Sequence, residues 1–303
     1  MRLALRTRRR LLLTAAAIAL TAIAAAAVAV YFERFSDPRA SRVVAERGCP
    51  GCDLAGIRLW WADLQGVDLT AADLAGARLW WADLTDATLA SADLRAASLW
   101  WATLTRIDLS HVDLTDGRIG SARIVEGNLR AAKLRNADLI GAVLDRADLR
   151  DADLTWADLR QSFGREANLR GARLPDSNFY LADFSGALFA KADLTRASLV
   201  QTDLSGADLA GANLAGANLN QAVLRNAVLR RARLADAQLT GADLGGADLV
   251  GADLSRANLW KANLSKADLT GADLTGAALD EAGFTDARLC RTKLPTGVDS
   301  SGC

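Results

Sequence analysis

The 303-residue sequence is poor in the residues on which most enzyme and metal sites depend. It has one histidine, His111, and four cysteines, Cys49, Cys52, Cys290 and Cys303. Histidine is the usual acid or base at neutral pH, and structural zinc sites need four His or Cys ligands close together. No Ser/His/Asp set, His/Cys/Asp cluster or phosphate-binding loop is found. We therefore expect no catalytic, metal or cofactor site and no enzyme activity, and we interpret His111 as a surface residue.

Long apolar stretches and an excess of one charge are also scarce. Lys and Arg together number 36, as do Asp and Glu, and nine of the basic but only three of the acidic residues precede residue 53. The remainder of the chain therefore has a mild net charge of −6. The one long uncharged stretch, residues 11–32, follows a basic cluster in residues 1–10.

Residues 11–32 are predicted to be a membrane-spanning or signal segment. About 20 apolar residues cross a bilayer core. Basic residues before such a segment stay in the cytoplasm, and aromatic residues such as Tyr31 and Phe32 favour the interface. Two interpretations are open: a retained single-pass anchor, or a cleaved export signal. The second rests on a similarity of residues 7–12 to a twin-arginine signal and on the small residues 25–27. Both place the remaining chain outside the cytoplasm, on the membrane or as an exported soluble protein.

From residue 53 to residue 294 the sequence repeats every five residues without a change of phase. Stepping by five from Leu54 to Leu294 meets 49 positions, of which 42 are Leu. A small residue, usually Ala, stands two positions earlier, and Asp or Asn most often stands directly before. A fixed period of this kind is the first feature that a fold prediction must explain. The exceptions to Leu are Ile119, Ile124, Gly164, Phe179, Phe184, Phe189 and Phe284.

A period of five fits neither an α-helix nor a straight strand. Five helical residues turn through about 500°, so successive Leu side chains would point in all directions, and an odd step alternates the faces of a strand. One inward Leu in every five therefore requires a bend in each unit, with Leu and the preceding Ala on the same inward face. Leu-Trp-Trp-Ala-Asp-Leu at residues 59–64 recurs at 79–84 and, with Thr for Asp, at 99–104. Successive copies are four repeat units apart, which predicts coils with four sides.

The unit Ala-Asp/Asn-Leu-x-x resembles the motif of the pentapeptide-repeat family and covers about four-fifths of the chain. The resemblance implies an all-β fold, a right-handed quadrilateral β-helix of about 12 coils. We divide the chain into a basic cytoplasmic segment (1–10), a transmembrane or signal helix (11–32), a connector with an N-terminal cap (33–52), the β-helix (53–294) and a C-terminal cap (295–303).

The connector predicts a short helix that covers the open end of the first coil. Ser36 or Asp37 is a suitable N-cap, and Pro38 suits the first turn. We expect Val43 and Val44 to point inward. An uncovered β-helix end exposes unpaired backbone groups that can pair with another copy of the chain, so assembly into a homo-oligomer is an open alternative.

Cys49 and Cys52 open the repeat, and Cys290 and Cys303 close it. A Cys-x-x-Cys pair can be redox-active or bind zinc, but no thioredoxin-like pattern surrounds this one and the other cysteines lie at the far end. All four are similar to end features of the family, and we interpret them as structural caps. Disulfides are permitted outside the cytoplasm; Cys290 and Cys303 would close a C-terminal loop, whereas a bond between Cys49 and Cys52 needs a suitable turn.

Gly164 and Phe184 both depart from the motif, and the second departure explains the first. Gly164 stands where Leu belongs, and Phe184 occupies the equivalent position one coil later. We expect the Phe184 ring to fill the space that Gly164 leaves. Pro175 and Pro295 each follow a central residue, at a corner where a missing amide donor is tolerated.

Six of the eight Trp residues are predicted to lie on one side of three consecutive coils. Stacked aromatic pairs contribute about 0.5–1.5 kcal/mol each, so this ladder has a purely structural interpretation. An exposed apolar patch of this size, however, usually marks a contact surface, and we interpret it as a flat platform with no deep pocket. The predicted interaction face comprises Trp60, Trp61, Trp80, Trp81, Trp100, Trp101 and, farther along the same column, Trp260.

The sequence leaves three candidate functions to compare. The first is a non-enzymatic, membrane-tethered scaffold whose Trp face contacts an unknown protein partner or the membrane surface. The second, implied by the family resemblance, is an acidic nucleic-acid mimic that inhibits a DNA-binding enzyme such as a topoisomerase. The third is an enzyme. We favour the first, because a net charge of −6 with interspersed Arg is weak for a mimic, an exported rod would not meet a topoisomerase, and no residue set supports catalysis. No nucleic-acid partner is expected.

Overall fold

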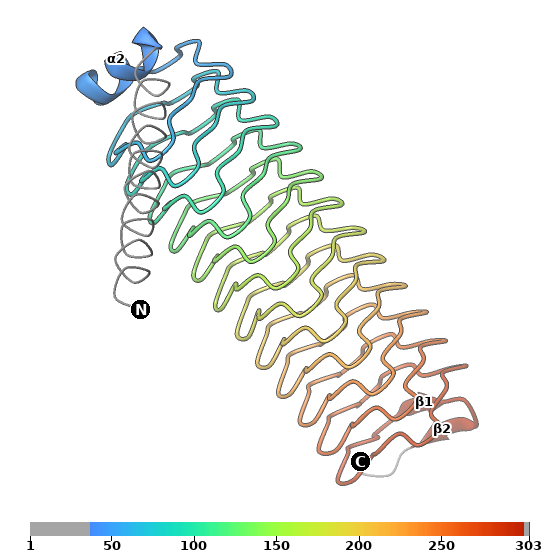
Figure 1. Ribbon diagram of the computed structural model, residues 1–303. Helices are drawn as coiled ribbons and strands as arrows, with labels where there is room; N and C mark the ends of the chain where they lie inside the picture. Colours follow the sequence, from blue (N-terminus) through green and yellow to red (C-terminus); the bar gives the residue numbers. More distant parts are fainter. Residues whose placement is uncertain (1–36, 300–302) are drawn as a thin grey trace, which may run out of the picture.

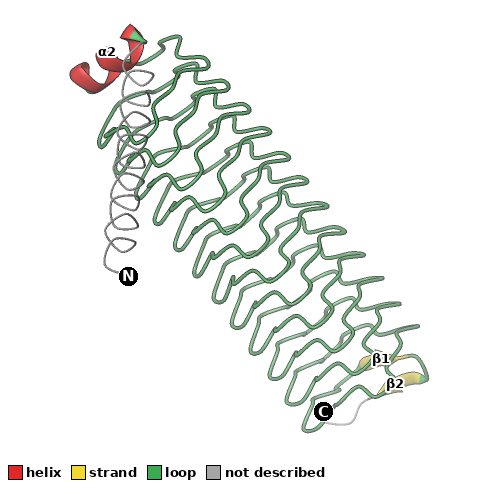
Figure 2. Ribbon diagram, viewed as in Figure 1, coloured by secondary structure: helices red, strands yellow, loops and turns green. Residues whose placement is uncertain are grey.

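The computed structural model describes residues 37–299 and 303, which form a long rod of stacked coils (Figure 1). Helix α2 (Pro38–Glu46) lies at one end of the rod. At the other end, β1 (Thr292–Leu294) pairs antiparallel with β2 (Gly297–Asp299). Between these ends the chain forms turns and single bridges, drawn as loop in Figure 2.

The predicted membrane or signal segment, residues 11–32, lies outside the described residues. Over residues 37–299 and 303, no helix combines the length and the apolar character needed to cross a bilayer.

Every side of the rod is one five-residue unit paired with the same side of the next coil. Parallel bridges join residues 20 positions apart, from Gly48–Asp68 through to Asp273–Lys293, without interruption. Leu54 N donates to Asp73 O at 2.7 Å, and this bond recurs along the rod. The predicted four-sided β-helix, with four repeat units in each turn, is therefore confirmed.

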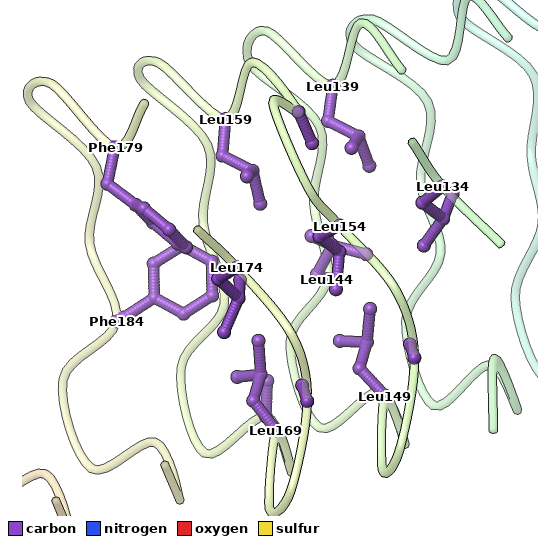
Figure 3. Close-up of a cluster of buried hydrophobic side chains, with 14 of the residues drawn as sticks. Leu134, Leu139, Leu144, Leu149, Leu154, Leu159, Leu169, Leu174, Phe179 and Phe184 are labelled. Carbon is purple, nitrogen blue, oxygen red and sulfur yellow. The ribbon is translucent and has the colours of Figure 1, made fainter. Parts of the chain in front are cut away.

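The interior of each coil holds one large and one small side chain from each side. The central Leu, Ile or Phe residues and the Ala residues two positions earlier are buried along almost the whole rod. Figure 3 shows the central Leu and Phe side chains of several neighbouring coils. Where a hydroxyl replaces Ala, it donates to a backbone carbonyl, as Ser162 Oγ does to Leu159 O at 2.6 Å. A second large side chain does not fit, because protein interiors are close-packed. The other buried hydroxyl residues of this kind are Ser177, Thr202 and Thr292.

The Asp or Asn before each central residue satisfies an amide that the coil leaves unpaired. In the described units, the residue after the central Leu has no backbone partner for its N–H. Asp53 Oδ1 accepts from Ala55 N at 3.1 Å, and the same bond recurs in many units. Pro175 occupies this position, where Arg173 replaces Asp, because proline has no N–H to satisfy. The corner position predicted for Pro175 is thus confirmed.

Each corner contains a residue with positive φ, two positions after the central residue. These φ angles lie between 51° and 69° in every unit from Leu54 to Leu289, in a turn closed by bonds such as Ile57 N to Leu54 O at 3.1 Å. Gly adopts this conformation without strain, and Gly recurs at this position. This requirement was not predicted from the sequence, although the recurrent Gly was its signal. His111 occupies such a corner and is exposed, as predicted.

The space that Gly164 leaves is filled by Phe184. A Cβ atom at Gly164 would lie 2.2 Å from a carbon of the Phe184 ring, and Phe184 is fully buried. The ring also packs edge-on against Phe179, with centroids 5.0 Å apart (Figure 3). The predicted compensation between neighbouring coils is confirmed.

Helix α2 packs on the first coil and closes the end of the core. Asp37 caps it, since Asp37 Oδ1 accepts from Arg39 N at 2.9 Å. Val43 is buried as expected, but the expectation for Val44 is wrong: Val44 is exposed, and Ala40 is buried instead. Consecutive helical residues point about 100° apart, so two neighbours cannot both face the coil, whereas residues three apart can.

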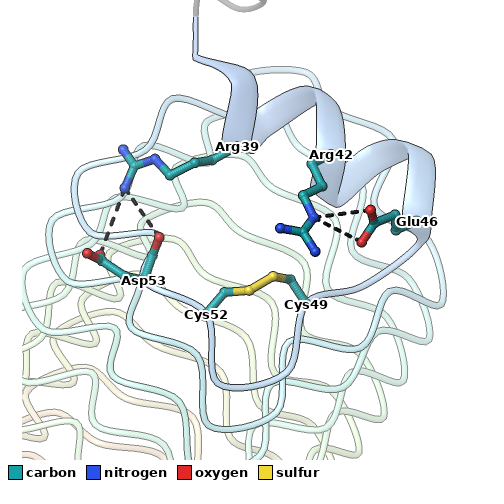
Figure 4. Close-up of a disulfide and its surroundings, with 6 residues drawn as sticks. All are labelled: Arg39, Arg42, Glu46, Cys49, Cys52 and Asp53. Carbon is teal, nitrogen blue, oxygen red and sulfur yellow. Dashed lines mark hydrogen bonds and ion pairs between the residues drawn. A yellow bond between two sulfur atoms is a disulfide. The ribbon is translucent and has the colours of Figure 1, made fainter.

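Both ends of the rod carry a disulfide. Cys49 is bonded to Cys52 beside α2, where Arg39 Nη1 also donates to Asp53 O at 3.3 Å (Figure 4). At the far end, Cys290 is bonded to Cys303. The four cysteines therefore lie where the stacking of coils stops.

We predict that Gly164 and Phe184 are coupled. Phe184→Leu alone leaves a cavity and Gly164→Leu alone clashes with the ring, so each should destabilise this part of the rod. Truncation to Ala at position 184 should cost about 3–5 kcal/mol. The double change to Leu restores the arrangement of other coils and should recover most of the loss. Hydrogen exchange over residues 160–190 measures this, with Phe189→Leu as a control; additive losses in the double variant would contradict the coupling.

We also predict that the C-terminal coil loosens in acid. The Thr275 hydroxyl, then Lys293 and the Thr275 amide, lower the pKa of Asp273 to about 2. Because this pKa lies below the unfolded value of about 3.9, Asp273 stabilises the fold above about pH 4, and the stabilisation is lost as pH falls toward 2. Asp273→Asn keeps an acceptor without the charge, so hydrogen exchange over residues 270–299 should depend less on pH. An unchanged pH profile would exclude this role.

Candidate functional site

The strongest candidate site is an aromatic cluster on three consecutive coils at one corner of the rod, which we call the Trp patch. Trp61 N donates to Trp80 O at 2.9 Å, and Trp81 N donates to Trp100 O at 3.0 Å, so backbone bonds set the coil-to-coil register. The first Trp of each pair follows the central Leu, and the second is the positive-φ corner residue. The patch comprises Trp60, Trp61, Trp80, Trp81, Trp100 and Trp101.

The three corner residues form a continuous stack. Their ring centroids are 5.1 Å apart from Trp61 to Trp81 and 5.0 Å apart from Trp81 to Trp101, with planes 7° apart in each pair. The three residues are still 49%, 42% and 47% exposed, in chain order. Stacking alone therefore leaves a large apolar surface open to a partner.

The second column is stacked only in its first two coils. Trp60 stacks on Trp80 with centroids 5.4 Å apart. Trp100 instead packs edge-to-face against Trp101, with centroids 5.3 Å apart and planes at 88°. The predicted vertical stacking thus fails in the last coil of this column, because the backbone repeat places the residue but does not set its χ angles.

The two inner indole N–H groups differ in their partners. Trp80 Nε1 donates to Ser98 Oγ. Trp60 Nε1 is buried without an acceptor in the described residues. The equivalent position to Ser98, one coil earlier, holds Arg78, and an Arg side chain has no acceptor.

A row of exposed arginines runs along the side that leads into the patch. Arg58, Arg78 and, after Ser98 in the third coil, Arg118 occupy the position that Asp or Asn holds in most units. The side that follows the patch carries Asp63 and Asp83 instead. The patch is therefore basic along one edge and acidic along the other.

The ladder stops after its third coil and leaves a hollow there, which we call the notch. The positions one coil beyond Trp100 and Trp101 hold Gly120 and Ser121, so no ring continues either column. The predicted flat platform is hollowed at this point, because Gly120 has no side chain to cover the ends of the rings. The notch has a volume of about 160 Å³ and is lined by Trp100, Trp101, Gly120, Ser121, Asp138 and Ile140.

The remaining two Trp residues lie apart from the patch. Trp260 lies in the same column, but eight coils farther along the rod than Trp100. Lys261 Nζ lies 4.2 Å from its ring centroid. Trp156 belongs to another side, with Arg135 Cζ 5.4 Å from its ring centroid. The structure does not bring Trp260 to the other predicted contact residues.

Elsewhere the surface charges are largely paired between coils. Arg106 Nη2 lies 2.7 Å from Asp86 Oδ2, and Arg146 Nη2 lies 2.8 Å from Glu126 Oε1. The hydrogen bond from Arg106 lowers the pKa of Asp86. In the part of the chain that the structure describes, no group of three or more His, Cys, Asp or Glu residues is arranged to hold a metal ion.

Comparisons with known proteins agree on the repeat. The family model described as pentapeptide repeats matches residues 52–89, 92–125, 128–163, 165–201, 207–246, 232–271, 247–286 and 261–294. HetL, a pentapeptide repeat protein involved in heterocyst differentiation regulation in the cyanobacterium Nostoc sp. strain PCC 7120, is 34% identical over 84% of this chain and 95% of its own, with a TM-score of 0.31. No curated protein matches the sequence.

Two further solved structures are more distant. The pentapeptide repeat protein Rfr23 of the cyanobacterium Cyanothece 51142 is 29% identical over 40% of this chain and 58% of its own, with a TM-score of 0.19. QnrB1, a plasmid-mediated fluoroquinolone resistance protein, is 22% identical over 65% of this chain and 89% of its own, with a TM-score of 0.33.

The hydrogen-bond partners of the Trp60 and Trp80 indole N–H groups predict two opposite changes in stability. Ser98→Ala removes the acceptor of Trp80 Nε1 and should destabilise the patch by about 1–3 kcal/mol. Arg78→Ser should give Trp60 Nε1 the acceptor that it lacks and should stabilise the same coils. Chemical denaturation followed by Trp fluorescence, with indole N–H exchange by NMR, checks both. If Arg78→Ser leaves the Trp60 indole proton exchanging as before, the proposed equivalence of the two sites is wrong.

Proposed function

Since the chain belongs to the pentapeptide-repeat family, which supplies a repeat scaffold, we propose that it is a non-enzymatic scaffold tethered to a membrane through residues 11–32. Its Trp patch contacts the membrane surface, or a protein partner held there. The observation that carries this proposal is the position of the patch: all six rings lie in the first coils after α2.

The chemistry of the patch supports a lipid interface. Trp favours the boundary between membrane and water, because its ring is apolar and its N–H can meet water or a headgroup. The exposed row of Arg58, Arg78 and Arg118 adds cations, and each basic residue near an anionic membrane contributes about 1 kcal/mol. A rod lying on this side would therefore bring both rings and arginines to the headgroups.

The proximity of the patch to the tether supports the same arrangement. Residue 32 ends the predicted apolar segment and Trp60 begins the patch, so only the connector and the start of the first coil separate them. Part of this connection is the short helix α2 (Pro38–Glu46), held on the first coil by Arg39. A retained anchor would keep the patch close to the bilayer at high local concentration. If the segment is cleaved instead, the exported rod would need a protein partner to hold it at a membrane.

We predict that the side of the rod that carries the Trp patch contacts lipid. The test uses the full chain in vesicles whose acyl chains carry bromine, a quencher of Trp fluorescence. Trp156→Phe/Trp260→Phe leaves only the six patch reporters, which should be strongly quenched and blue-shifted. The matched variant with Trp260 and the six patch residues changed to Phe leaves only Trp156, which lies on another side of the rod and should be quenched little.

Two results would argue against this arrangement. Equal quenching of the two variants would show that the rod has no preferred side. No quenching in either would remove the lipid contact and leave the protein partner. That version is tested by capture from native membranes: if changing all six patch residues to Ser leaves the captured proteins unchanged, the patch is only a structural ladder.

A further inference from the structure

The notch at the end of the Trp patch is walled by two aromatic rings at a right angle. Trp100 and Trp101 have planes 88° apart and centroids 5.3 Å apart. Trp81 covers one face of Trp101, and Ser121 rather than a ring lies one coil beyond its other face. Two indole surfaces therefore border one small hollow of about 160 Å³.

A carboxylate completes the notch opposite these rings. Asp138 is half-buried, and its Oδ1 accepts from Ile140 N at 3.0 Å. None of the ion pairs between described residues engages Asp138. A Cβ atom at Gly120 would lie 3.3 Å from Ile140 O and 3.6 Å from both Asp138 Oδ1 and Trp100 Nε1. The carboxylate, a backbone carbonyl and the indole N–H edge of Trp100 thus border the same space, and the absence of a side chain at Gly120 keeps it open.

This combination of groups suits a cation with an apolar surface. Cations are attracted to the faces of Trp rings, and aromatic cages recognise methylated ammonium groups in this way. A carboxylate supplies the opposite charge, and a volume of about 150 Å³ accommodates a group as large as benzene. A small hydrated ion would forgo the contact with the two rings. We propose that the notch binds a methylated ammonium group.

Asp138 is the carboxylate of the notch, and two arginines lie near it without forming an ion pair with it. Arg160, one coil beyond Ile140, donates through its Nε to Asp158 at 2.8 Å, and its charge also interacts with that of Asp138. Arg118 is the parallel-bridge partner of Asp138 on the neighbouring coil and is exposed. Unlike the rings of the notch, the Trp260 ring already has Lys261 Nζ over it. That ring is therefore not expected to bind a second cation.

The binding test uses the full chain in a detergent without an ammonium group. The Trp156→Phe/Trp260→Phe background restricts fluorescence to the Trp patch, and tetramethylammonium chloride is titrated against NaCl of equal ionic strength. A saturable change specific to tetramethylammonium is expected. Gly120→Trp should abolish it by filling the notch, and Asp138→Asn, which keeps the acceptor for Ile140 N, should weaken binding about fivefold.

Asp63→Asn is the matched control, because it removes the same charge beside the patch but outside the notch, and it should leave binding unchanged. A response that does not saturate, that survives Gly120→Trp, or that falls equally in the two Asp→Asn variants would overturn the proposal. The inference does not depend on the proposed lipid contact, since binding is measured without a bilayer.

The same chemistry occurs in choline lipid headgroups and in free ammonium compounds, and vesicles separate these sources. If phosphatidylcholine vesicles suppress the tetramethylammonium response and phosphatidylglycerol vesicles do not, the group comes from a lipid headgroup. If the response persists in both, the ligand is a free molecule. Absence of the response in detergent and in both vesicle types would refute the site.

Discussion

The structure depends on the small interior of a coil whose four sides each contribute one Leu and one Ala. Because five residues must make both a side and a corner, no other side chain can reach the interior. A single insertion would rotate every later residue out of place, which explains why the phase is kept from Leu54 to Leu294. Gly164 and Phe184 show that the constraint acts on volume, since a missing side chain in one coil is tolerated when the next coil supplies the atoms.

The same constraint places nearly all variation on the outer surface. Three residues of each unit face outward: the one before the central residue and the two after it. The first is usually an Asp or Asn that binds a backbone amide, and the last must accept a positive φ. A surface feature can therefore be built at any height along the rod without altering the core. Repeat proteins gain extended binding faces in this way, since each unit contacts only its neighbours.

The coil, the identity of the buried residues and the compensation at Gly164 could be predicted from the sequence, because each follows from backbone periodicity and volume. The shape of the notch could not be predicted, since it depends on the χ angles of Trp100 and Trp101 as much as on Gly120. The inward face of α2 was predicted only in part, because the pitch of a helix brings Ala40 and Val43 to the coil together and turns Val44 away.

The side that leads into the Trp patch departs from the motif in a way that the core does not require. Arg58, Arg78 and Arg118 cannot accept a hydrogen bond, so the amides of Trp60, Trp80 and Gly120 lose the acceptor that Asp or Asn supplies elsewhere. Each such bond contributes roughly 0.5–1.5 kcal/mol. These arginines do not contribute to the packing of the interior, since their side chains are exposed.

Local rules are commonly broken at functional sites, where the outward chemistry matters more than the stability of the unit. Farther along, cross-coil pairs such as Asp86 with Arg106 cancel charge between neighbouring coils. That pairing works against a continuous acidic face of the kind that a nucleic-acid mimic would need. At the Trp patch, by contrast, Arg58 and Arg78 lie beside exposed rings in two of the three coils, so cations and apolar surface are found together there.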